Sequence, residues 1–198
     1  AEIDLSFGGP AHKALFHIRE RAKQYHLLFR QDCAVLDTFF ASYVRNFFNE
    51  MSKTKIFPKA LSRYATPQGR YPKMESGGLI GNSHWLALEI DLFQRCIYVY
   101  DSETSVMRRA QLERQLEPIR VVVPMLLTKL NANYNAEKFD WKWLTSPSQS
   151  NGFDCGMFTI KFIEFLHAGK NVEGVDRSRI SAWRVKLAAE IFGAHFDP

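Results

Sequence analysis

The sequence predicts an α+β domain in which a small central mixed sheet is flanked by helices. Apolar residues recur at helical spacing near both ends of the 198-residue chain. Two short, almost wholly apolar segments follow each other in its middle, which is typical of adjacent strands in a sheet covered on both faces. Helices at both ends of such a sheet define the α+β class, and we expect residues 1–198 to form one domain.

The first 83 residues are predicted to form two helices and a loop. Residues 1–9 read as a loose leader ahead of a helix over about residues 12–29. Asp32 is expected to cap a second helix over about residues 34–51, whose many Phe and Tyr residues indicate burial. Residues 52–83 hold three prolines and four glycines without periodicity, so we expect a long loop there, with one short helix near residues 60–64.

The rest of the chain is predicted to alternate strands and helices. Residues 84–90 and 96–100 form a hairpin around a turn. Pro118 and Pro124 are expected to break or kink the helix that follows. That helix covers about residues 110–130, and after it come a strand at 139–144, a helix at 155–167 that ends at Gly169, and an amphipathic helix at 178–192.

The composition indicates a globular protein without a membrane span or a disulfide scaffold. No apolar run approaches the ~20 residues that a span needs, and the start of the chain has no secretory pattern. Cys33, Cys96 and Cys155 cannot all pair and none belongs to a CxxC motif, which favours a reducing compartment, nucleus or cytoplasm. We expect no metal and no cofactor. The net charge of +5 comes from Lys and Arg spread along the chain, which disfavours nucleic-acid binding.

The segment 149–157 carries the strongest chemical signal. Cys155 lies in the first turn of a predicted apolar helix, whose N-terminus has a partial positive charge that favours thiolate over thiol. The N–H groups at that end can also stabilise an oxyanion. Asp154 is predicted to be the N-cap, and its negative charge opposes thiolate formation, so Cys155 needs a base. Gly152 and Gly156 allow other backbone to approach the sulfur closely.

His84 and Asp101 are the candidates for that base and its orienting carboxylate. His84 opens the first strand of the hairpin and Asp101 follows the second, so antiparallel pairing brings the two side chains together. Each residue alone has an ordinary explanation: a buried helix cysteine, a surface histidine, a turn aspartate. The combination with Cys155 indicates nucleophilic catalysis.

Four other residues are interpreted as structural. Cys96 lies in an apolar strand and is expected to be buried and inert. Cys33 lies near a predicted helix start but lacks flanking glycines. Trp141 and Trp143 alternate around Lys142 and are expected to pack on one side of their strand.

Two segments resemble the Ulp/SENP-type cysteine proteases, which cleave SUMO and related ubiquitin-like modifiers: HWLALEIDLFQRCIYVYDS and QSNGFDCGMF. The family pattern is His-Trp, a hairpin ending in Tyr-Asp-Ser, then Gln, Asn-Gly and Asp-Cys-Gly. The resemblance implies a papain-like (Ulp/adenain-type) fold. It also implies catalytic roles: Cys155 as nucleophile, His84 as general base and acid, Asp101 as its orienting partner and Gln149 as oxyanion-hole donor.

The same resemblance implies a partner and a substrate channel. The partner is SUMO or a related ubiquitin-like modifier with its conjugates, cleaved after a C-terminal Gly-Gly by a monomeric enzyme. Trp85 is expected to form one wall of a narrow tunnel for this Gly-Gly end, with Gly152 nearby. The family's opposite wall is the Trp of a Trp-Leu-Asn-Asp element, whose nearest equivalent is residues 35–38 and therefore Leu36. The missing Trp is similar to the divergence of bacterial effector members of the family.

Other functions stay open. A deubiquitinase or deneddylase would use the same residues. An effector-type acetyltransferase has a related His–acid–Cys site, although the Asp-Ser after the hairpin and the loop from Gln149 to Cys155 favour the protease. A non-catalytic binding module is disfavoured by the intact candidate residues, and a nucleic-acid binder rests on charge alone.

Overall fold

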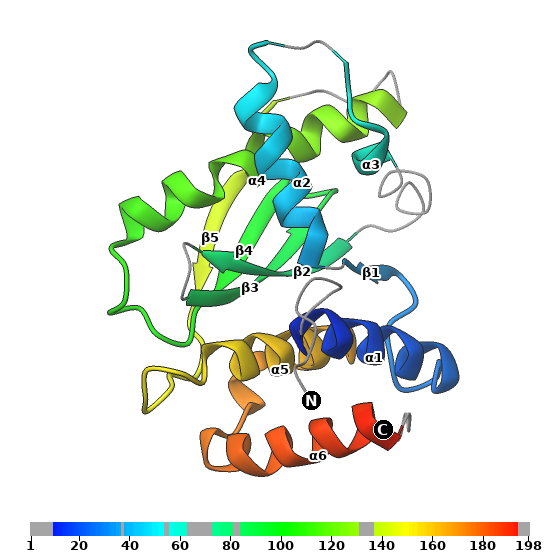
Figure 1. The fold of residues 1–198 in the computed structure, drawn as a ribbon, viewed down its shortest axis with the longest axis vertical. Helices are drawn as coiled ribbons and strands as arrows, with labels where there is room; N and C mark the ends of the chain where they lie inside the picture. The colour runs from blue at the N-terminus through cyan, green and yellow to red at the C-terminus, as the bar shows by residue number, and fades with distance from the viewer. Residues whose placement is uncertain are drawn as a thin grey trace.

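Helices cover both faces of a five-stranded mixed sheet in the computed structural model (Figure 1). The structure describes residues 10–36, 38–53, 56–62, 73–80, 84–130 and 137–193, so the predicted leader lies outside the described residues. The elements are α1 (Pro10–Gln24), β1 (Cys33–Val35), α2 (Thr38–Glu50), α3 (Lys59–Ser62), β2 (Lys73–Ile80), β3 (His84–Asp91), β4 (Cys96–Tyr100), α4 (Arg109–Leu130), β5 (Asp140–Leu144), α5 (Cys155–His167), the 3-10 turns η2 (Val172–Gly174) and η3 (Arg177–Arg179), and α6 (Ile180–Gly193). This arrangement confirms the predicted α+β class. None of the described helices combines the length and the apolar character that crossing a membrane requires.

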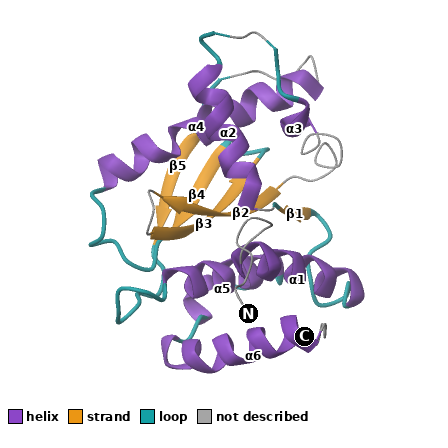
Figure 2. Ribbon diagram, viewed as in Figure 1, coloured by secondary structure: helices purple, strands orange, loops and turns teal. Residues whose placement is uncertain are grey.

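The sheet is built around the predicted hairpin of β3 and β4. These strands pair antiparallel, with Ala87 opposite Tyr100. In the turn between them, the Asp91 carboxylate accepts hydrogen bonds from the backbone N–H groups of Phe93 and Gln94. Strand β5 joins β4 in parallel, β2 joins β3 antiparallel, and β1 joins β2 in parallel. The resulting order is β1-β2-β3-β4-β5, which places the hairpin inside the sheet (Figure 2).

Strand β2 occupies a segment that the sequence predicts to be a loop. All eight of its residues pair with β3, from Lys73 opposite Asp91 to Ile80 opposite His84. The glycines in this segment weaken its intrinsic preference for a strand, which is why the prediction was wrong. Pairing with a strand on each side outweighs that local preference.

The second helix begins later than predicted. Residues 33–35 form β1 at the edge of the sheet, and α2 starts at Thr38. Asp32 therefore does not cap this helix, and its carboxylate instead binds the Arg30 guanidinium, with Nε 2.9 Å from Oδ1. A strand of three residues is too short to show an alternating pattern, so the sequence alone does not separate it from a helix start.

Helix α4 runs through both of its prolines, so the predicted break does not occur. Pro124 has no N–H to donate to the Arg120 carbonyl, four residues earlier. The Phe139 N–H, just before β5, donates to that carbonyl at 3.4 Å, and Arg120 Nε donates to the Phe139 carbonyl at 2.5 Å. The helix tolerates Pro124 because a neighbouring segment satisfies the backbone group that proline frees.

Helices α2 and α4 lie over one face of the sheet (Figure 1). A layer of apolar side chains fills the space between them and the sheet. Phe40 of α2, Val122 of α4 and Leu88 of β3 are fully buried in it. Trp141 and Trp143 of β5 both pack against this layer, as the sequence predicts.

The other face packs against α5, whose bounds are those predicted, and α1 and α6 lie further out (Figure 1). Ala87 and Tyr100 of the sheet meet Phe158 and Phe162 of α5 in a second apolar cluster. Trp183 of α6 packs against the outer side of this cluster. The helix that begins with Cys155 is thus held between the sheet and two other helices.

Candidate active site

A buried imidazole–carboxylate pair lies where β3 begins and β4 ends. His84 is the first residue of β3, Asp101 directly follows β4, and their Nε2 and Oδ1 atoms are 2.8 Å apart, as antiparallel pairing predicts. His84 is 1% exposed and Asp101 6%. The Glu103 N–H donates to the same Oδ1 at 2.9 Å and holds the carboxylate in place. Because Nε2 faces Asp101, Nδ1 is the ring nitrogen that can exchange a proton with a second group.

The turn after Asp101 places a further carboxylate near this pair. The hydroxyl and the N–H of Ser105 both donate to Glu103 Oε1, at 2.5 and 3.1 Å. These two bonds, the hydroxyl's first, hold the pKa of Glu103 below its usual range. The nearby charge of Asp101 raises the pKa of Glu103, and the charge of His84 lowers it, both by less than the two hydrogen bonds. Glu103 therefore stays ionised over a wider pH range than an ordinary glutamate.

Cys155 is the first residue of α5 and is 5% exposed. Helix α5 packs on β3 so that a Cβ placed on Gly156 would be in van der Waals contact with the Trp85 indole, 3.6 Å from its Cδ1. This contact joins the residue after Cys155 to the residue after His84. The two candidate catalytic residues therefore lie at the same end of the interface between α5 and β3.

Asn151 organises the loop that leads to Cys155. Its Oδ1 accepts hydrogen bonds from the N–H groups of Phe153 and Asp154, at 3.1 and 3.0 Å, and its Nδ2 donates to Asp154 Oδ2 at 2.7 Å. Asparagine suits this turn because its short amide accepts and donates at once. The sequence motif contains Asn151, but its spacing alone does not reveal this bracing role.

Gln149 is held against the corner that follows Asp101. Its N–H donates to the Ser102 carbonyl at 2.8 Å, and its Oε1 accepts from the Ser102 hydroxyl at 3.0 Å. Its Nε2 donates to the Asn151 carbonyl at 2.5 Å. The side-chain amide is thereby fixed in orientation, and its second N–H is the donor that can face an oxyanion.

Asp154 precedes α5 but does not act as the predicted cap. Its side chain makes no cap hydrogen bond to the described helix, and its backbone is itself helical, with φ −89° and ψ −4°. The carboxylate binds Asn151 through Oδ2 and the Arg184 guanidinium of α6 through Oδ1. Sequence reasoning missed Arg184 because the two partners are 30 positions apart and no spacing rule links this loop to a later helix.

The two predicted substrate contacts besides Trp85 have different outcomes. Leu36 is 2% exposed in the apolar layer against α2 and α4, whereas Trp85 faces α5 on the other side of the sheet. Leu36 cannot form the wall opposite Trp85, and this prediction is wrong. Gly152 is exposed, and no described atom lies within 4 Å of a Cβ built on it, so packing of the described chain does not require glycine there.

The other two cysteines are buried. Cys96 is 2% exposed, and burial raises the pKa of its thiol, as expected of an inert cysteine. Cys33 in β1 has its Sγ 2.9 Å from Nδ1 of His167, the last residue of α5. This cysteine–histidine contact joins a sheet edge to a helix end, which the sequence does not predict.

Known proteins share this fold. The family model for the Ulp1 protease family, C-terminal catalytic domain, matches residues 79–196. A structure of the SUMO protease Ulp1 with its catalytic cysteine oxidised to a sulfenic acid superposes with a TM-score of 0.68, at 18% identity over 93% of this chain and 77% of that chain. The C-terminal Ulp1 protease domain in complex with Smt3, the yeast ortholog of SUMO, gives 0.67, at 20% identity over 93% and 79%. ChlaDub1 from Chlamydia trachomatis gives 0.52, at 14% identity over 97% and 95%. Among curated proteins, none matches the chain.

The fold and the family match together define a cysteine protease catalytic domain. The chain belongs to the Ulp1 protease family. The matched segment contains the four predicted catalytic positions, which are His84, Asp101, Gln149 and Cys155.

Proposed function

We propose that this domain removes SUMO from its conjugates, cleaving after the C-terminal Gly-Gly of the modifier through Cys155, His84 and Asp101. The observation that carries the proposal is the buried 2.8 Å contact of His84 with Asp101, near the N-terminal end of the helix that Cys155 begins. Membership of the Ulp1 protease family supports thiol-dependent hydrolysis. The complex of the Ulp1 domain with Smt3 supports SUMO as the modifier.

In the proposed reaction, Cys155 attacks the carbonyl carbon of the last glycine while His84 takes the thiol proton. Asp101 orients the imidazole and stabilises its protonated form. The tetrahedral intermediate then expels the lysine amine, which takes the proton from His84, and a thioester to Cys155 remains. Water hydrolyses this thioester with His84 as the base, which releases the modifier carboxylate and restores the thiol.

Gln149 and the first turn of α5 supply the proposed oxyanion hole. The first i→i−4 bond of the helix runs from the Phe158 N–H to the Asp154 carbonyl at 3.0 Å, so the earlier N–H groups, including that of Cys155, point out of the helix end. The second N–H of Gln149 is the other donor. Loss of one such donor costs about 3 kcal/mol of transition-state stabilisation.

Trp85 is the proposed wall of the channel for the Gly-Gly end. Its indole packs against Gly156, directly beside the nucleophile. A bulky side chain in place of either modifier glycine would collide with a ring at this position. The wall opposite Trp85 has no assigned residue, since Leu36 lies in the core.

A panel of modifier probes tests the proposal. SUMO, ubiquitin and NEDD8, each with a C-terminal electrophile, are incubated with the chain, and the adduct is located by mass spectrometry. We expect a SUMO adduct on Cys155 that Cys155→Ala abolishes and the control Cys96→Ala retains. An adduct with ubiquitin or NEDD8 in place of SUMO would replace the proposed modifier, and the absence of any adduct would contradict proteolysis of this class of substrate.

A further inference from the structure

The segment before Cys155 is tied to α6, a helix that carries no residue of the proposed site. Arg184 binds Asp154 Oδ1 through Nη2. The Asp154 side chain is 9% exposed and that of Arg184 46%. The exposed Phe153 ring lies 6.0 Å from the guanidinium carbon. A nearly buried carboxylate directly before the proposed nucleophile thus has a cationic partner from a distant part of the chain.

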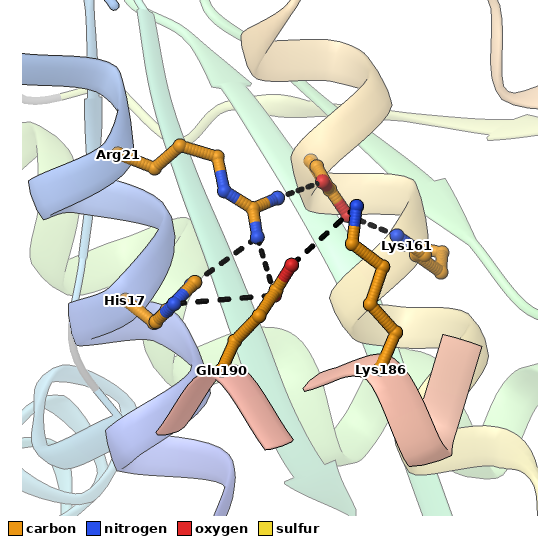
Figure 3. A network of polar contacts seen from close by, with 6 residues as sticks. His17, Arg21, Lys161, Lys186 and Glu190 are labelled. Atoms are coloured by element: carbon orange, nitrogen blue, oxygen red, sulfur yellow. Dashed lines mark hydrogen bonds and ion pairs between the residues drawn. The ribbon is translucent and has the colours of Figure 1, made fainter. Parts of the chain in front are cut away.

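Helix α6 has other anchors that dock it on the domain. Ile180, at its start, is buried, and the Trp183 ring meets the Phe165 ring of α5 edge-on at 6.4 Å. Towards its end, Glu190 Oε2 accepts from Nη2 of Arg21 on α1 at 2.6 Å (Figure 3). These contacts hold the helix at both ends. The contact of Arg184 with Asp154 lies between them and reaches towards the site.

The carboxylate of Asp154 belongs to the residue directly before Cys155. A carboxylate beside a thiol disfavours the thiolate, because two negative charges would then lie close together in a poorly solvated place. Among the described residues, His84 and Asp101 lie at the same end of the interface between α5 and β3, and Arg184 from α6 binds Asp154. A cation paired with Asp154 offsets its charge and so favours the thiolate.

The same contact belongs to a chain of hydrogen bonds that crosses the loop. Asp154 is bonded to Asn151, the Asn151 carbonyl accepts from Gln149, and Gln149 is bonded to Ser102. Arg184 therefore fixes one end of a polar chain whose middle holds the proposed oxyanion donor. A change at Arg184 reaches the site through Asp154 and this chain.

We propose that Arg184 is a positioning residue of the thiol site, which neutralises Asp154 and thereby favours the thiolate of Cys155. The inference rests on the proposed function, since it takes Cys155 as the nucleophile. It adds to that function a residue of α6 that lies outside the proposed catalytic set.

Alkylation of Cys155 by iodoacetamide tests this role, because the thiolate displaces iodide while the thiol does not. The rate is measured against pH in the whole chain by peptide mass spectrometry. Arg184→Gln should raise the pH at which the alkylation rate is half-maximal by about one unit. The rate on the acidic side should therefore fall about tenfold, while the rate on the alkaline plateau stays unchanged. Arg184→Lys keeps the charge and should restore most of the rate.

Two further variants separate this role from a general loss of charge or folding. Lys186→Gln removes a cation of the same helix whose Nζ lies 3.4 Å from Glu190, and it should leave the profile unchanged. Asp154→Asn removes the carboxylate, so Arg184→Gln should no longer shift the profile in that background.

The outcomes distinguish this inference from the proposed function. An Arg184→Gln profile that overlays the unaltered protein, or an equal shift in the Asp154→Asn background, would overturn the role of Arg184 and leave Cys155 as the nucleophile. Failure of the unaltered protein to react at Cys155 with iodoacetamide and with every modifier probe would overturn both.

Discussion

The two faces of the sheet are held by different interactions. Towards α2 and α4 lies a large cluster of buried apolar side chains, in which Phe40, Val44 and Val122 are fully excluded from solvent. Towards α5, α1 and α6, apolar contacts next to the sheet give way to buried charges further out. Arg21, at 4% exposure, lies between two carboxylates there.

The charged cluster joins three helices (Figure 3). Arg21 of α1 donates to Glu164 of α5 at 2.5 Å and to Glu190 of α6 at 2.6 Å, and His17 Nδ1 lies 3.4 Å from the same guanidinium. Lys161 binds Glu164 as well. Arg21 Nε is buried and makes no hydrogen bond within the described part of the chain, and Glu190 Oε1 has the ion pair with Lys186 at 3.4 Å.

The difference shows two ways of holding a helix on a sheet. An apolar layer is stabilised by close packing, so removing a buried side chain lowers the free energy of unfolding in proportion to the cavity that it leaves. A buried ion cluster is stable only when its positive and negative charges are paired, because each charge has lost its hydration on burial. The helix that begins with Cys155 uses both: apolar side chains pack it on the sheet, and the ion cluster joins it to α1 and α6.

The largest effect is expected from a cavity in the apolar layer. Phe40→Ala removes a fully buried ring of α2 and should lower the free energy of unfolding by about 4 kcal/mol. Urea unfolding followed by circular dichroism measures this loss. Phe16→Ala on α1 is the control, since Phe16 is 50% exposed and should change stability little. Similar losses for both variants would contradict the tight packing of this layer.

Loss of the central cation of the charged cluster comes next. Arg21→Met leaves the buried Glu190 and the partly buried Glu164 without their shared partner and should cost about 3 kcal/mol of unfolding free energy. Changing Arg21, Glu164 and Glu190 together to Met should recover part of this loss, because neither carboxylate is then left without Arg21, while Lys161 loses its partner Glu164. Denaturant unfolding of both variants tests the contrast. A triple variant as unstable as the single one would show that packing around Arg21, and not charge balance, holds these helices.

Alkaline pH should weaken the sheet through Cys96. Burial raises the pKa of this thiol in the folded protein, so its contribution to stability is complete below the unfolded value and is lost as pH rises through the folded value. The unfolding free energy should fall at alkaline pH with a slope of at most about 1.4 kcal/mol per pH unit from this group. Urea unfolding at stepped alkaline pH should show that Cys96→Val removes this slope. Parallel curves for the two proteins would sink the prediction.

The smallest effect is expected on the surface of α1. Lys23 lies two residues after Arg21, is 68% exposed and pairs with Glu20 at 2.5 Å. Lys23→Gln should cost only about 0.3 kcal/mol, and concentrated salt should abolish the difference, because water already screens this pair. Thermal unfolding with and without salt measures it. A cost near that of Arg21→Met would mean that burial does not set the value of an ion pair on this helix.

Local patterns predicted the parts of the fold that depend on near neighbours. The β3–β4 hairpin follows from two apolar runs and a turn, and α5 follows from an apolar run bounded by a polar loop and Gly169. The contact of His84 with Asp101 was predictable because an antiparallel hairpin brings the start of one strand beside the end of the next.

Predictions from local sequence patterns were wrong where contacts with distant segments decide the structure. Strand β2 is rich in glycine and forms because β1 and β3 pair with it on either side. The resemblance implies a channel wall at Leu36, but this residue directly follows β1 and lies in the apolar layer, while Val35, the last residue of β1, joins the cluster under α5. A motif gives the order of residues and does not say which face of a sheet they occupy.

By itself, the sequence determined the α+β class, the hairpin, helix α5 and the family to which Cys155, His84, Asp101 and Gln149 point. Each of these rests on periodicity or on a motif within a short segment. Only the tertiary structure decided that Asp154 pairs with Arg184 and that Arg21 lies buried between two carboxylates. Those contacts join elements far apart in the chain, and their partners are chosen by how the helices pack, which no local pattern encodes.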